Sequence, residues 1–145
     1  MRALAVLFAA LLLALPAPAD ARADVKRVSR DLGGPVDARI DEIARLRADH
    51  TQVVVSGACA SACTLYLALE TTCLAPGARL GFHAPTTDGP FGAISPRALR
   101  ARAQQMADHY PAPMAAWFLD GPAWDLDGVT WLTVQQAARL GAQRC

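Results

Sequence analysis

Ser61 and His83 are the two residues whose types and spacing could support nucleophilic catalysis. Ser61 follows a strand expected over residues 52–55 and a run of small residues, where an apolar helix over 64–69 begins. Such a turn exposes a hydroxyl, and the free N–H groups of a helix N-terminus bind developing negative charge. His83 ends a strand expected over 79–83, so its imidazole could reach the same crevice and activate the hydroxyl. On spacing alone, the favoured interpretation is plainer: Ser61 is a helix N-cap and His83 a strand-end residue.

The segments that must position this pair alternate between helices and strands. The β-branched run over 52–55 is typical of a strand buried on both faces, as in a parallel sheet. Further strands are expected over 24–29, 71–75 and 79–83, and helices over 36–49, 95–110, 114–119 and 133–140. This alternation predicts α/β layering in one domain.

Four motifs occur in the order found in the Clp protease/crotonase superfamily. They are Gly33-Gly34-Pro35-Val36, the run 53–57, Ala60-Ser61-Ala62-Cys63 and the run 73–85. The segment from Trp131 to Gly141 is similar to that family's last helix. The chain resembles the proteolytic subunit of the Clp protease over residues 31–142, and is most similar to small exported Clp-protease-like proteins of bacteria. The resemblance implies a mostly parallel sheet flanked by helices.

The resemblance also assigns roles to individual residues. Ser61 falls on the family's nucleophile and His83 on its general base. Gly34 and Ala62 fall where backbone N–H groups form the oxyanion hole. The resemblance therefore implies a serine hydrolase in which His83 takes the proton of Ser61 and two N–H groups hold the tetrahedral oxyanion.

Two features depart from the family pattern. The third member of the family's triad, an Asp, falls on about Val129, which cannot orient an imidazole. Asp127 is the nearest carboxylate that could take this role, and Asp125 is the alternative. The strand and helix that precede the glycine motif are reduced to residues 24–29, so we expect a truncated version of the fold.

The N-terminus is typical of a cleavable secretory signal peptide. Arg2 supplies a positive start, residues 3–15 form an unbroken apolar run, and small residues alternate over 16–23. Because a membrane-spanning helix needs about 20 apolar residues, this run is too short to be one. We expect residues 1–23 to be removed, residues 24–145 to form the Clp-protease-like domain, and the protein to be periplasmic or secreted, with no transmembrane segment after cleavage.

Four cysteines behind a signal peptide indicate two disulfides, for which three pairings are possible. We favour Cys59 with Cys63, whose spacing places both on one helical face, and Cys73 with Cys145. A zinc site built from Cys59, Cys63 and His83 is the disfavoured alternative. We expect neither a metal nor a cofactor.

Charge and composition narrow the functional classes. Removal of residues 1–23 takes Arg2, Arg22 and Asp20 from totals of 14 basic and 13 acidic residues, which leaves a neutral domain. A neutral domain does not indicate nucleic acid as a partner.

We expect a peptidase-like exported hydrolase with a peptide or protein substrate. A catalytically inactive Clp-protease-like module that binds peptides or a partner protein stays open, and so does assembly into a homo-oligomer. An acyl-CoA hydratase is disfavoured because coenzyme A is cytosolic.

Overall fold

The computed structural model describes residues 24–86 and 94–145. The expected signal peptide, residues 1–23, lies outside the described residues, as do residues 87–93. Within the described ranges, no helix has the length and apolar character needed to cross a membrane.

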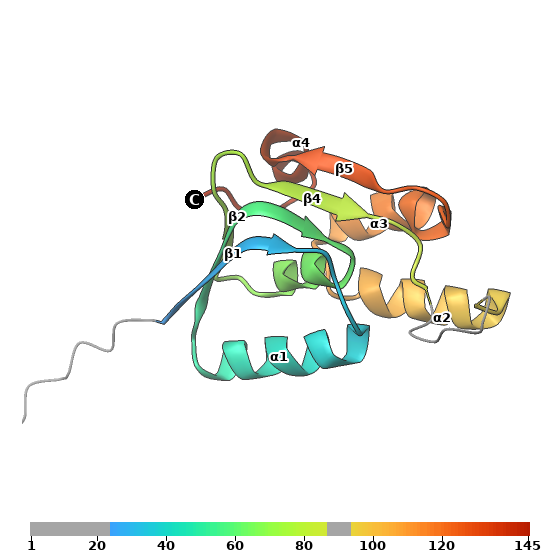
Figure 1. Cartoon of the computed structure of the whole chain (residues 1–145), viewed down its shortest axis with the longest axis horizontal. Helices are drawn as coiled ribbons and strands as arrows, with labels where there is room; N and C mark the ends of the chain where they lie inside the picture. Colours follow the sequence, from blue (N-terminus) through green and yellow to red (C-terminus); the bar gives the residue numbers. More distant parts are fainter. Residues whose placement is uncertain (1–23, 87–93) are drawn as a thin grey trace, which may run out of the picture.

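A mostly parallel sheet forms the centre of the molecule (Figure 1). Its strands lie in the order β1 (Val25–Asp31), β2 (Gln52–Ala60), β4 (Arg79–Phe82) and β5 (Thr130–Thr133), and β3 (Thr72–Leu74) also pairs with β2. All pairings are parallel except that of β5 with β4. The α/β fold class with a mostly parallel sheet is therefore confirmed.

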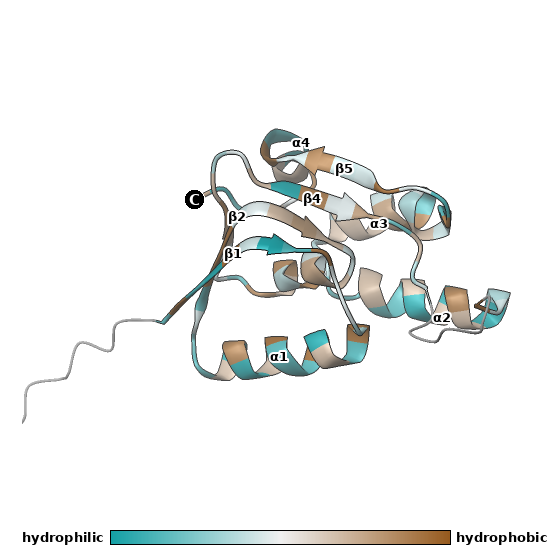
Figure 2. Ribbon diagram, in the orientation of Figure 1, coloured by the Kyte–Doolittle hydropathy of each residue, from teal (hydrophilic) through white to brown (hydrophobic). Residues whose placement is uncertain are grey.

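In the part of the chain that the structure describes, six helical segments complete the fold. They are α1 (Val36–Ala48), η1 (Ser61–Ala68), α2 (Pro96–Ala107), α3 (Ala112–Asp120), η2 (Pro122–Trp124) and α4 (Val134–Arg139). Helix α1 packs against η1, which lies between α1 and the sheet, and α2 packs against α3 (Figure 1). Figure 2 shows hydrophobic and hydrophilic residues alternating along α1, as expected for a helix with one face on the core.

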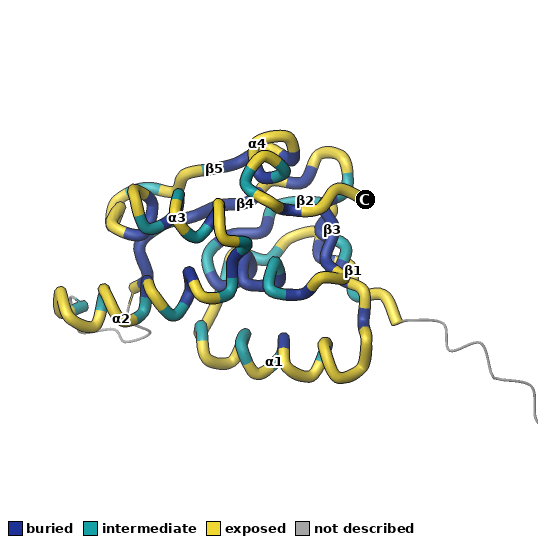
Figure 3. The backbone as a smooth tube through the Cα atoms, turned by 180° about the vertical axis from the view of Figure 1, so that it is seen from behind, coloured by how far each residue is buried: buried dark blue, intermediate teal, exposed yellow. Residues whose placement is uncertain are grey.

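The core lies between the sheet and these helices (Figure 3). Val53 and Val55 of β2 are fully or almost fully buried, as the β-branched run predicts. Phe82 of β4 contacts Trp117 and Tyr110 edge-on, with ring centroids 5.1 and 5.5 Å apart. These contacts join the carboxyl end of β4 to the helical layer.

Two strands differ clearly from the sequence prediction. Strand β2 continues through the small residues to Ala60, because its second half pairs with both β1 and β4 and these ladders satisfy its backbone groups. Strand β5 was not expected, since its four residues are too few for a clear alternating pattern.

The C-terminus is fastened along β3. Cys145 is bonded to Cys73, with 72 residues of sequence separation. The Leu74 N–H donates to the Gln143 carbonyl at 2.9 Å, and the Cys145 N–H donates to the Leu74 carbonyl at 3.0 Å. Both the covalent and the hydrogen-bonded contacts hold the last residues against the sheet.

Candidate active site

Three neighbouring parallel strands end at one edge of the sheet. Asp31 of β1 lies opposite Cys59 of β2, and Ala60 of β2 lies opposite Gly81 of β4. The residues that follow these strands are therefore brought to the same edge. They are the Gly33-Gly34 pair, Ser61 and His83. In open α/β sheets, the carboxyl ends of the strands are where ligands bind.

Ser61 has a backbone conformation that few residues other than glycine adopt. Its φ is 56°, in the left-handed region. This conformation costs an L-residue about 1 to 2 kcal/mol and persists only where surrounding contacts enforce it. The interpretation of Ser61 as a helix N-cap is wrong, because Ala60 is the N-cap of η1 and no side chain caps this helix. Strain of this kind gathers at functional sites, so the observation favours a functional role for Ser61.

A buried hydrogen-bonded chain holds the Ser61 peptide. Thr64 donates its hydroxyl proton to the Ser61 carbonyl at 2.7 Å, and the Thr64 and Tyr110 hydroxyl oxygens lie 2.7 Å apart. Because Thr64 has used its one proton, Tyr110 must donate to Thr64. Burial raises the pKa of Tyr110. Tyr110 therefore keeps its proton and remains a donor.

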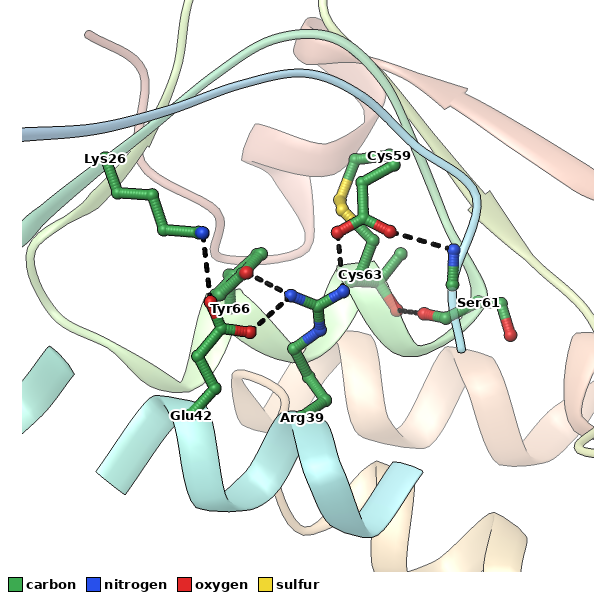
Figure 4. Close-up of polar contacts among 10 residues, drawn as sticks. Lys26, Arg39, Glu42, Cys59, Ser61, Cys63 and Tyr66 are labelled. Carbon is green, nitrogen blue, oxygen red and sulfur yellow. Dashed lines mark hydrogen bonds and ion pairs between the residues drawn. A yellow bond between two sulfur atoms is a disulfide. The ribbon is translucent and has the colours of Figure 1, made fainter. Parts of the chain in front are cut away.

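A short disulfide encloses Ser61 on both sides of the turn. Cys59, near the end of β2, is bonded to Cys63 in η1, as favoured from the sequence (Figure 4). Both sulfur-bearing residues are buried. The bond leaves neither sulfur as a thiolate, and the described residues contain no group of three or more side chains able to hold a metal ion.

The glycine loop packs directly on Ser61. Gly33 and Gly34 both have positive φ, at 115° and 134°. A Cβ added to Gly33 would lie 2.7 Å from Ser61 Cβ and 3.0 Å from Ser61 Oγ, so only glycine fits there. The same test at Gly34 finds no atom within 4 Å, so this glycine borders open space. A substrate carbonyl could therefore approach the Gly34 backbone.

His83 has a backbone acceptor beside one ring nitrogen. Its Nδ1 lies 2.6 Å from the Ala84 carbonyl oxygen. With the proton on Nδ1, Nε2 is an unprotonated acceptor, which is the form a general base needs. The Ala84 N–H donates to the Asp125 carbonyl at 2.8 Å, which ties Ala84 to the segment before β5.

The two candidate carboxylates for the third position lie in that segment and are exposed. Asp125 Oδ1 accepts the N–H groups of Asp127 and Gly128 at 3.1 and 2.9 Å, which closes a local turn. Over the residues that the structure describes, no hydrogen bond joins His83 to Asp125, to Asp127 or to Ser61. The acceptor at the imidazole is the Ala84 carbonyl instead.

A cavity of about 570 Å³ opens between α1 and α2. Its lining includes Val36, two residues after Gly34, and Thr86, three residues after His83, so the cavity lies near the candidate site in sequence. Asp37 and Arg102 form an ion pair at 2.7 Å in its wall. A larger cavity, about 850 Å³, lies at the opposite end of β4 around Arg79, away from Ser61.

An ionic cluster that the sequence did not indicate lies beside this site. Asp31 accepts the Gly33 N–H and pairs with Arg39. Glu42 pairs with both Arg39 and Lys26. The local signal for the first contact is an Asp two residues before a Gly, which is an Asx-turn pattern. Nothing in the sequence indicates that Arg39 reaches Asp31, because that contact depends on the packing of α1 beside β1.

Comparisons with known proteins identify the fold. No family model matches the chain, and no curated protein matches it in sequence. It is similar to two mutants of the 1510-N membrane-bound stomatin-specific protease, one in complex with a substrate peptide. Identities are 20% and 18% and both TM-scores are 0.57.

The similarity to that protease covers 83% of this chain but 59% and 62% of those chains, so this chain spans less than two thirds of their length. A ClpP1 mutant from Listeria monocytogenes is 22% identical, with 81% of this chain and 70% of that chain covered and a TM-score of 0.54. These similarities confirm the Clp-protease-like fold.

Proposed function

We propose that this protein is an exported serine hydrolase that acts on peptides, with Ser61 as nucleophile and His83 as general base. One observation carries the proposal: a strained Ser61 lies against Gly33 at the sheet edge where His83 also follows its strand. The fold is shared with solved proteases, one of them holding a substrate peptide, and this favours a peptide as the substrate.

The proposed reaction begins when His83 Nε2 takes the proton from Ser61 Oγ. The Ser61 oxygen then attacks the scissile carbonyl, and the oxyanion accepts hydrogen bonds from the N–H groups of Gly34 and Ala62. His83 passes its proton to the leaving amine, and water hydrolyses the resulting acyl-enzyme. Since Ser61 and His83 share no hydrogen bond before substrate binds, we expect that contact to form in the complex.

The Ala84 carbonyl is our candidate for the orienting role that an Asp takes in the family. Asp127 and Asp125 could take this role only by a shift of their segment toward His83. Asp127→Asn and Asp125→Asn variants separate these alternatives. Unchanged nucleophile reactivity in both variants would assign the role to the carbonyl, whereas a loss in one would identify that carboxylate.

Export to an oxidising compartment is part of the proposal. The signal-peptide pattern of residues 1–23 and the two disulfides support it. Edman or mass-spectrometric analysis of the N-terminus should find a cut between residues 17 and 24. Recovery of the uncut chain from the cytoplasm would contradict this part.

The alternative is a peptide- or protein-binding module with a retired active site. The absence of a direct Ser61–His83 hydrogen bond within the described residues favours it. In that case the crevice at the sheet edge would hold a peptide without cleaving it.

Labelling with a fluorophosphonate probe, read by intact mass, decides between the two. We expect the oxidised protein to gain one adduct that Ser61→Ala does not gain. Ser56→Ala, which removes an exposed hydroxyl from β2, the strand that precedes Ser61, should still be labelled. A folded wild-type protein that gains no adduct, or a Ser61→Ala protein labelled as fast as wild type, would refute the hydrolase and leave the binding module.

A further inference from the structure

A partly buried ionic cluster contacts the glycine loop through Asp31, and Figure 4 shows its members Lys26, Arg39, Glu42 and Tyr66. Asp31 and Lys26 come from β1, Arg39 and Glu42 from α1, and Tyr66 from η1. Lys26 pairs with Glu42 at 2.9 Å, and Arg39 pairs with both Glu42 and Asp31. The cluster is electrically balanced, with two cations and two anions.

Arg39 is the branch point of this cluster. Nη2 donates to Asp31 Oδ2 at 2.5 Å, and Nη1 donates to Glu42 Oε2 at 2.6 Å and to the Tyr66 hydroxyl. Its guanidinium carbon lies 4.4 Å from the Tyr66 ring centroid, and only 12% of the side chain is exposed. Charge-assisted hydrogen bonds with little access to water are stronger than neutral ones, so Arg39 holds Asp31 firmly.

Asp31 transmits this hold to the glycine loop. While Oδ2 binds Arg39, Oδ1 accepts the Gly33 N–H at 3.0 Å. Gly33 in turn is in contact distance of Ser61, as the clash of an added Cβ shows. A continuous series of contacts therefore runs from Arg39 through Asp31 and Gly33 to Ser61.

We propose that Arg39 is a positioning residue of the Ser61 site, which through Asp31 sets the place of the Gly33-Gly34 backbone. This inference rests on the proposed function, because the loop carries one of the two oxyanion donors, Gly34. Two consecutive glycines have no side chains with which to fix their own position. Oxyanion donors act only when held at the right place before the reaction, so an outside anchor is needed.

Arg39→Lys is the test variant and Glu42→Gln its matched control. Lys keeps the charge but has one nitrogen, so it cannot bind Asp31 and Glu42 in the way that the two terminal nitrogens of Arg39 do. Glu42→Gln weakens the same cluster without touching Asp31. We expect the second-order rate of fluorophosphonate labelling to fall about tenfold or more in Arg39→Lys. In Glu42→Gln it should stay within about twofold of wild type.

A second measurement does not depend on activity. The exchange rate of the Gly33 amide, followed by ¹H–¹⁵N NMR, should rise in Arg39→Lys and stay unchanged in Glu42→Gln. A wild-type protein that resists labelling while Gly33 still responds to Arg39→Lys would refute the hydrolase and retain Arg39 as the anchor of the loop. Unchanged Gly33 exchange in Arg39→Lys would overturn the role of Arg39, whatever the labelling shows.

Asp31→Asn serves if Arg39→Lys does not fold. It keeps an oxygen for the Gly33 N–H but removes the charge that Arg39 binds. Slower labelling or faster Gly33 exchange in a folded Asp31→Asn protein supports the proposal. Wild-type values for both would overturn it.

Discussion

The two disulfides should contribute very unequally to stability, because they close loops of very different length. Cys59 and Cys63 are 4 residues apart, whereas Cys73 and Cys145 are 72 apart. In the chain-entropy model, the stabilisation grows with the logarithm of the loop that a cross-link removes from the unfolded ensemble. The long bridge should contribute about 4 kcal/mol and the short one about 2 kcal/mol to the free energy of unfolding.

Two double variants each retain one of the two disulfides. Cys59→Ala with Cys63→Ala leaves only the long one, and Cys73→Ala with Cys145→Ala leaves only the short one. Urea unfolding of each variant, oxidised and then reduced, gives the free energy that its remaining bridge supplies. Because both measurements use the same variant, the cavity left by the alanines cancels from the difference.

The same variants also show which bridge affects the reactivity of Ser61 and which affects the stability of the fold. The short bridge encloses Ser61, so its reduction should slow fluorophosphonate labelling while costing little stability. Reduction of the long bridge should do the reverse, because Cys73 lies opposite Val54 in the first half of β2, whereas Ser61 follows the end of that strand. Equal losses of stability on reduction, or a larger loss from the short bridge, would refute the loop-entropy reasoning.

Three further predictions concern single side chains. Gly33→Ala should abolish labelling and destabilise the fold more than Gly77→Ala does. Both glycines have a positive φ, but only at Gly33 would an added Cβ clash with a neighbour; equal urea midpoints for the two variants would contradict this. Tyr110→Phe removes the hydroxyl that donates to Thr64, so it should lower the free energy of unfolding by about 1 kcal/mol and slow labelling. A wild-type labelling rate would exclude a role of Tyr110 in positioning Ser61. Partial burial works to raise the pKa of Glu42, but its hydrogen bonds from Lys26 and Tyr66 and the nearby cations hold the pKa below the usual 4.5. Ionised Glu42 therefore stabilises the fold above about pH 4.5, and this stabilisation is lost as the pH falls through the lowered pKa. The urea midpoint should consequently drop less on acidification in Glu42→Gln than in wild type.

Local patterns in the sequence predicted much of the secondary structure. The helix expected over 95–110 is present as α2, and the Ser95 hydroxyl caps its start by accepting the Ala98 N–H. The helix expected over 133–140 is present as α4, and Thr133 and Gln136 form a capping box at its start. Such features depend on residues a few positions apart, so their chemistry can be read directly from the chain.

The convergence of the candidate site was also accessible from the sequence, once strands were assigned. Parallel strands joined by helical crossovers end at one edge, and Ser61 and His83 each follow such a strand. The motif order then led to Gly34 and Ala62 as the proposed oxyanion donors, which remains a prediction. The glycine that packs on Ser61 is Gly33, and only the structure distinguished it from its neighbour.

The tertiary structure alone decided how each site residue is held. The left-handed φ of Ser61 and the hold of Arg39 on Asp31 involve contacts between different elements. The carbonyl beside His83 belongs to its neighbour Ala84, which is tied to the distant Asp125. Sequence periodicity reports which face of an element is buried, but not which polar atoms meet across a packed interface. The pairing of polar atoms is set by small differences in register and helix position. The residues of the candidate site could therefore be predicted from the sequence, whereas their geometry is determined only by the folded chain.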